Sequence, residues 1–109
     1  MTFYMNNYRW EVVTVSSTSK WLRRSDGVLT LGVTDCNEMI VFISQHLRGS
    51  LFRKVLLHEL THAWMFSYDY KLPIEQEEFV CDFLASNAED IIAKADEIIC
   101  YSLNKRATH

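Results

Sequence analysis

One short motif in the sequence has the residue types and spacing to bind a metal ion, His58-Glu59-Leu60-Thr61-His62. Residues four apart in a helix lie on one face, about one turn apart, so His58 and His62 can bind one zinc ion together. Glu59 follows His58 by about 100° of helical rotation, so its carboxylate can flank the metal without occupying it. There Glu59 can take a proton from a zinc-bound water and later pass it to a leaving amine. The motif predicts Zn²⁺ as cofactor, two histidine ligands and Glu59 as general base.

A hydrolytic zinc site takes a third protein ligand and leaves the fourth position for water. A metzincin motif would continue with a glycine and a third histidine, but Met65 and Tyr68 stand at those positions, so that class is excluded. An acidic cluster at the start of the next predicted helix offers Glu77 and Glu78 instead. Cys81 is a further alternative, although a thiolate is less usual in hydrolytic sites of this kind.

The neighbours of the two glutamates favour Glu78 as the third ligand. Asp82 lies four residues after Glu78, on the same helix face, and can hydrogen-bond the outer nitrogen of a zinc-bound histidine. Glu77 has the apolar Cys81 at the same offset. Glutamates at a helix start also complement the helix dipole, which explains Glu75 and is an alternative explanation for Glu77.

The residues before the motif predict strands. Trp10–Val15 is rich in β-branched residues. Val28–Thr34 alternates partly, and Met39–Ser44 is a nearly continuous apolar run. These last two segments predict a β-hairpin with a short loop.

The second half of the chain predicts helices. Leu51–Phe66 carries apolar residues and both histidines on one stripe, and Ser50 is its expected N-cap. Pro73 suits the first turn of the next helix, which runs to about Leu103, either unbroken or with a bend near Ser86–Asn87. We therefore expect a single α+β domain over residues 1–109, with a sheet of about three strands packed on the motif helix and on a long C-terminal helix.

The composition indicates which binding partners and which cellular compartment to expect for this protein. The net charge is −3, with 11 basic and 14 acidic residues, which gives no electrostatic reason to expect nucleic acid or an anionic membrane. No apolar run is long enough to cross a bilayer, and the first ten residues contain no signal-peptide core. Three cysteines without a Cys-x-x-Cys pattern indicate reduced thiols, so we expect a cytoplasmic protein. The apolar stripe of Ile91–Leu103 suits either a core-facing helix or the seam of a homodimer.

Two segments together resemble the gluzincin clan of zinc metallopeptidases. His58-Glu59-Leu60-Thr61-His62-Ala63 looks like the active helix of thermolysin, and Glu78-Phe79-Val80-Cys81-Asp82-Phe83 resembles the Glu-x-x-x-Asp ligand helix of that clan. The small size, and an apolar strand before Leu56–His62, look closer to minimal gluzincins and to the ImmA/IrrE-like proteins of phages and mobile elements. The resemblance covers about Gly27 to Ala85.

The resemblance implies a zincin-like domain that hydrolyses a peptide or protein substrate. It implies that His58, His62 and Glu78 bind zinc, that Glu59 is the base and that Asp82 lies behind a histidine. It also implies that Met39–Ser44 lines the cleft and pairs with an extended peptide.

The chain departs from thermolysin-like enzymes in one respect. Those enzymes have a second domain whose tyrosine or histidine stabilises the oxyanion, and no such domain is found in these 109 residues. Tyr68, Tyr70, His46 and His109 are possible substitutes among which the sequence does not select. The alternative function is a zinc-containing module, latent or non-catalytic, that binds a partner without cleaving it.

Overall fold

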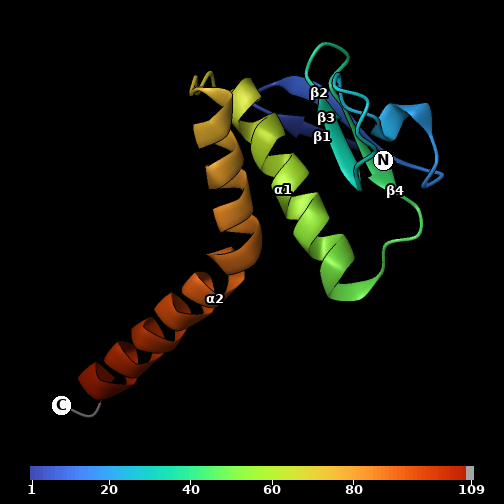
Figure 1. The fold of residues 1–109 in the computed structure, drawn as a ribbon. Helices are drawn as coiled ribbons and strands as arrows, with labels where there is room; N and C mark the ends of the chain where they lie inside the picture. Colours follow the sequence, from blue (N-terminus) through green and yellow to red (C-terminus); the bar gives the residue numbers. More distant parts are fainter. Residues whose placement is uncertain (108–109) are drawn as a thin grey trace.

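A four-stranded sheet and two helices make up the computed structural model, which describes residues 1–107 (Figure 1). The expected α+β class is confirmed, but the sheet has one strand more than the three expected. The strands are β1 (Thr2–Met5), β2 (Tyr8–Val15), β3 (Gly32–Asp35) and β4 (Ile40–Ser44). The helices are α1 (Gly49–Ser67) and α2 (Ile74–Ala107), besides a single 3₁₀ turn at Lys20–Leu22. Neither α1 nor the described part of α2 has the length and apolar character that a membrane-spanning helix requires.

The sheet is mixed, with strand order β1-β2-β4-β3. β1 and β2 form a hairpin closed by Asn6 and Asn7, both at positive φ, as a tight two-residue turn requires. β2 pairs with β4 in parallel, and β4 pairs with β3 antiparallel. The hairpin expected from the apolar pattern is therefore confirmed, although only from Gly32 onward. Before it, Leu29 makes a single isolated bridge to Arg23.

The core lies between the sheet and α1. Trp10 of β2 and Val41 and Ile43 of β4 are fully buried against Ala63 of α1. The indole Nε1 of Trp10 donates a buried hydrogen bond of 2.9 Å to Ser67 Oγ, which satisfies its polar atom. The packing fixes α1 across one face of the sheet, with its histidine face directed toward α2.

The helix boundaries differ from the expected ones at the start of α1. The N-cap is Arg48, whose backbone is extended and whose side chain makes no capping bond, so the expectation of Ser50 as N-cap is wrong. Ser50 already lies within the first turn. Pro73 directly precedes α2, and its carbonyl accepts from the amide of Glu77 at 3.0 Å.

Helix α2 is unbroken from Ile74 to Ala107, yet Figure 1 shows that it changes direction in its orange part. In this region Asn87 Nδ2 donates to the carbonyl oxygen of Phe83 at 3.0 Å. A side chain that bonds the carbonyl four residues earlier competes with the helical ladder and favours a bend. The sequence left open whether this helix is unbroken or bends near Ser86–Asn87. The structure combines both alternatives, because the helix is continuous and bent.

Candidate metal centre

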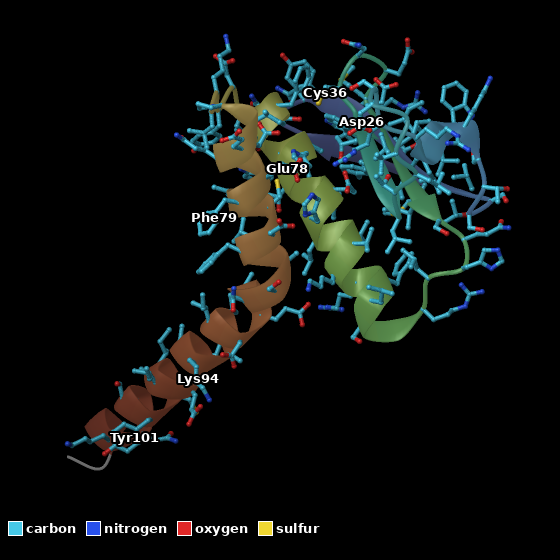
Figure 2. The ribbon with its side chains drawn as sticks, viewed as in Figure 1. Asp26, Cys36, Glu78, Phe79, Lys94 and Tyr101 are labelled. Carbon is cyan, nitrogen blue, oxygen red and sulfur yellow. The ribbon has the colours of Figure 1, made fainter. Side chains whose placement is uncertain are left out.

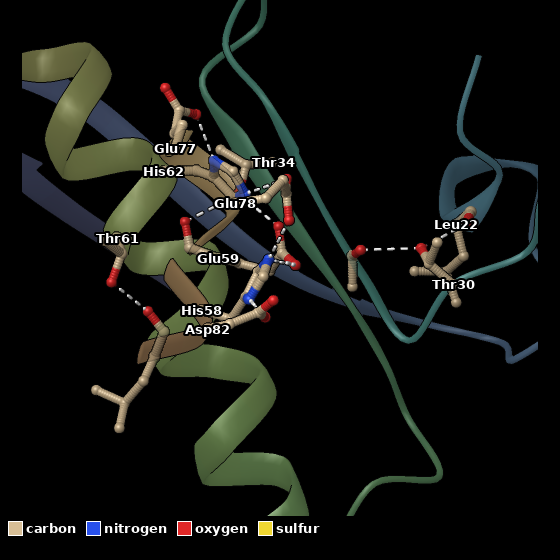
Figure 3. A network of polar contacts seen from close by, with 12 residues as sticks. Leu22, Thr30, Thr34, His58, Glu59, Thr61, His62, Glu77, Glu78 and Asp82 are labelled. Atoms are coloured by element: carbon tan, nitrogen blue, oxygen red, sulfur yellow. Dashed lines mark hydrogen bonds and ion pairs between the residues drawn. The ribbon is translucent and has the colours of Figure 1, made fainter. Parts of the chain in front are cut away.

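The two motif histidines and Glu78 come together because α1 and α2 run side by side (Figure 3). Figure 2 shows Glu78 on the side of α2 that faces α1, with Phe79 on the outer side. Glu78 Oε2 lies 3.2 Å from His58 Nε2, and Glu78 Oε1 lies 2.9 Å from His62 Nε2. A single carboxylate therefore faces the inner nitrogens of both imidazole rings.

Two further carboxylates hold the outer nitrogens of the rings. Asp82 Oδ1 lies 2.9 Å from His58 Nδ1, where the sequence analysis expected it, behind a histidine. Glu77 Oε2 lies 2.5 Å from His62 Nδ1. Glu77 is therefore more than a solvated helix-start glutamate, a role that sequence reasoning did not assign to it. A carboxylate in this place orients the ring and favours a proton on the nitrogen that it faces.

Glu59 is buried beside the pair of rings, with only 7% of its surface exposed. Its Oε2 lies 3.9 Å from His58 Nε2. Thr34 Oγ1 donates to Glu59 Oε1 at 2.8 Å, and it lies 2.9 Å from the backbone oxygen of the same residue. Burial raises the pKa of the Glu59 carboxyl, and the hydrogen bond from Thr34 partly opposes that shift. The carboxyl is thus fixed in one position close to the rings.

Gly32 at the start of β3 allows the strand to approach Glu59. A Cβ atom at this position would lie 2.9 Å from Glu59 Cγ and 2.9 Å from Val55 Cγ1. Real Cβ atoms essentially never make contacts this short. A residue without a side chain is therefore required for β3 and α1 to lie this close.

Cys81 places a sulfur atom near the rings, besides the carboxylates. It is fully buried, and its Sγ and ring nitrogens of His58 and His62 lie within 4.8 Å of one another. A second set within the same distance consists of His58, Glu78 and Asp82. Burial, and next the Glu78 carboxylate, raises the pKa of the Cys81 thiol to about 12. These residues lie close enough together to bind a metal ion, and the set admits either glutamate or cysteine beside the histidines.

A cavity of about 900 Å³ opens in front of these side chains. Its walls come from β3, from both helices and from the loop before β3. Strand β4 does not line it, because β2 and β3 pair with both of its edges and Val41 to Ser44 are buried. The expectation that Met39–Ser44 lines the cleft and pairs with a peptide is therefore wrong. β3 is the edge strand at the cavity, since Gly32, Val33 and Thr34 all line it.

The residues considered as oxyanion donors lie elsewhere. Of the described candidates, His46, Tyr68 and Tyr70 do not line the cavity, and Tyr68 stacks on Trp64 with ring centroids 4.3 Å apart. His109 lies outside the described residues. The cavity wall instead carries two basic side chains, Arg24 of the loop before β3 and Lys54 of α1. Neither was singled out by the sequence analysis.

In comparisons with known proteins, no protein family, no curated protein and no solved structure matches this chain.

Proposed function

We propose that this chain is a zinc metallopeptidase of the gluzincin type, with Zn²⁺ bound by His58, His62 and Glu78 and with Glu59 as general base. The substrate class is an extended peptide or an unfolded protein segment. The proposal draws on the motif spacing, on the geometry of the three carboxylates around the rings and on the cavity in front of them.

The observation that carries the proposal is a convergence of atoms that commonly bind zinc, two imidazole nitrogens and the oxygens of one carboxylate. Asp82 Oδ1 lies 2.9 Å from His58 Nδ1 and Glu77 Oε2 lies 2.5 Å from His62 Nδ1, so a neutral ring protonated on Nδ1 would present its Nε2 lone pair to Glu78. The two Nε2 atoms and both oxygens of Glu78 face one another across 3.2 and 2.9 Å. With both rings neutral, these acceptors would have no donor between them, and a cation at their centre would relieve the repulsion.

The donor set fits zinc in type and in spacing. Two imidazole nitrogens and one carboxylate, with a fourth position open, are the ligands of many hydrolytic zinc sites. Two ligand atoms bound at about 2.0–2.1 Å to a tetrahedral zinc lie about 3.4 Å apart. The observed separations are slightly shorter, and the Glu78 side chain, 45% exposed, has room to move outward.

Zinc bound there would polarise a water molecule and the carbonyl of the scissile peptide. Glu59, oriented by Thr34, accepts the proton of the attacking water and returns it to the leaving amine. Burial of Glu59 favours its protonated form and so supports proton uptake. The free edge of β3 offers backbone groups to an extended peptide, which would then run along the cavity.

The test compares zinc-loaded wild type with Glu59→Gln on a pooled library of internally quenched peptides. We expect cleavage by wild type and a loss of about 100-fold or more in the variant, since general acid–base catalysis contributes roughly 10²–10⁴-fold. Zinc content should be equal in the two proteins, because Glu59 is no ligand. Equal cleavage rates in both proteins would contradict the assigned role of Glu59.

The position of Cys81 favours a second candidate function, a non-catalytic zinc module that binds a partner. If Cys81 joined Glu78 and both histidines, four protein ligands would close the site to water. X-ray absorption at the zinc edge distinguishes the two, since a zinc–sulfur distance of about 2.3 Å is longer than zinc–nitrogen and zinc–oxygen distances. The peptidase proposal requires a nitrogen and oxygen shell that is unchanged in Cys81→Ser.

A further inference from the structure

The distal half of α2, residues 88–107 and here named the arm, leaves the body of the molecule (Figure 1). The molecule measures 61 × 30 × 28 Å, and its radius of gyration is 17.1 Å. A compact chain of 109 residues would have a radius of gyration of about 13 Å. The accessible surface is 7957 Å², about 1,700 Å² more than a compact monomer of this mass exposes.

The arm carries the continuation of the face by which α2 packs on α1. Before the arm, Cys81 is fully buried and Ala85 is partly buried, and Ala88, the first residue of the arm, is also partly buried among exposed neighbours. At three- and four-residue spacing this face continues as Ile92, Ala95, Ile99 and Leu103. The first turns of α1 lie next to Glu89, which pairs with Arg53. Beyond Glu89, α1 no longer covers the stripe.

The uncovered part of the stripe is strongly apolar and exposed. Ile92, Ile99 and Leu103 are 59%, 56% and 58% exposed, and Ile91 and Ile98 flank them with similar exposure. Contiguous apolar surface of this kind on a projecting helix is unfavourable in water and marks an interaction site. A standard interface buries about 800 Å² on each partner, which is within the excess surface of this chain.

We propose that the arm pairs with the arm of a second copy of this chain, in an antiparallel two-helix contact whose two-fold axis passes near Ala95. The residues of the stripe lie at similar distances along the helix before and after Ala95. Antiparallel pairing places Leu103 over the small Ala88 of the partner copy, and Ile99 beside Ile92 of the partner copy. Every large stripe residue then meets an apolar residue, as close packing requires.

The charges along the arm select the antiparallel orientation. Residues 89–97 contain four acidic side chains and one lysine, whereas Lys105 and Arg106 are the only charged residues of 98–107. Antiparallel pairing places the basic end of one arm beside the acidic beginning of the other. Parallel pairing would place acidic against acidic and basic against basic, which costs free energy.

The mass in solution tests the proposal independently of any peptidase activity. By light scattering during gel filtration, with reductant and over a series of concentrations, we expect wild type at twice the chain mass of 12.8 kDa. Ile99→Asp should give the monomer mass. Tyr101→Asp is the matched control and should remain dimeric, since Tyr101 is at least as exposed as Ile99, at 66%, but lies two residues on, about 200° around the helix and so on the opposite face of the arm.

Circular dichroism of both variants establishes that the helices persist. A monomeric wild type at concentrations of tenths of a millimolar would overturn the proposal, as would an Ile99→Asp variant that stays dimeric. The same masses are expected with a zinc chelator, so failure of the metal site leaves this result unaffected.

Orientation is tested by cross-linking in a Cys100→Ser background. Ala88→Cys and Leu103→Cys are prepared separately and then mixed under oxidation, since a disulfide needs Cβ atoms about 3.5–4.5 Å apart. Antiparallel pairing predicts a cross-link between the two variants in the mixture and little within either alone. Absence of the mixed cross-link would overturn the antiparallel arrangement.

Discussion

Thr34 and Glu59 form the contact on which the proposed base depends. The hydroxyl of Thr34 donates to Glu59 Oε1 at 2.8 Å in a part-buried environment. A hydrogen bond to a charged group contributes about 1.5–3 kcal/mol, which corresponds to roughly 10- to 100-fold in rate. We expect Thr34→Val to cleave peptides more slowly by that factor with zinc content unchanged. Thr34→Ser keeps the hydroxyl and should restore most of the rate; if Thr34→Val matched wild type, Thr34 would have no positioning role.

The carboxylates behind the histidines make a separate prediction about affinity. Asp82 and Glu77 each place a carboxylate oxygen beside the outer nitrogen of one ring. Removal of such a partner typically weakens metal binding about 10–100-fold. Asp82→Ala and Glu77→Ala should show this loss in competition with a zinc-binding dye. Glu75→Ala, an exposed glutamate of the same helix turn, should bind as wild type does; equal losses in all three would point to net charge instead.

Local spacing predicted part of this site and could not predict the rest. His58 and His62 are four residues apart, and so are Glu78 and Asp82. Each pair therefore lies on one face of its helix. The contact of Glu77 with His62 depends on how α2 crosses α1, which no spacing within α2 encodes. Thr34 reaches Glu59 across 25 positions of the chain, so only the assembled sheet reveals it.

At the scale of elements, the approach of β3 to α1 depends on Gly32. We expect Gly32→Ala to lower the free energy of unfolding in urea by about 1–3 kcal/mol, because its Cβ would overpack against Val55 and Glu59. Val55→Ala removes one of the two short contacts. The double variant should therefore lose less stability than the two single losses together, and strict additivity would show that the two side chains do not clash.

The strands illustrate which part of the sheet the sequence can encode. Alternation and apolar runs identified β2, β4 and the first three residues of β3, since these segments are rich in β-branched residues. Thr2–Met5 was not predicted as a strand because it is short and borders a polar turn. It forms β1 by pairing with β2. The resemblance implied that β4 pairs with a peptide, which would need a free edge. In the structure β2 pairs in parallel with β4, so β3 is the edge strand at the cavity, and strand patterns do not specify such a long-range pairing.

At the scale of the whole molecule, the candidate site and the arm are separate along the chain. Every residue of the site precedes Ser86, whereas the dimer stripe lies mostly after Glu89. A chain that stops after Asp90 keeps the Arg53–Glu89 pair and should bind zinc as the full chain does. It should also be monomeric by light scattering. Loss of zinc in this shortened chain but not in full-length Ile99→Asp would show that the arm supports the site.

The central claim is the identity and location of the metal site, and zinc content per chain tests it most directly. Wild type, Glu78→Ala and Cys81→Ser are purified in parallel from zinc-supplemented growth and analysed by atomic emission. We predict one zinc per chain in wild type and in Cys81→Ser, and a strong loss in Glu78→Ala. Zinc retained in Glu78→Ala but lost in Cys81→Ser would contradict the proposed ligand set, and a zinc-free wild type would contradict the metal site itself.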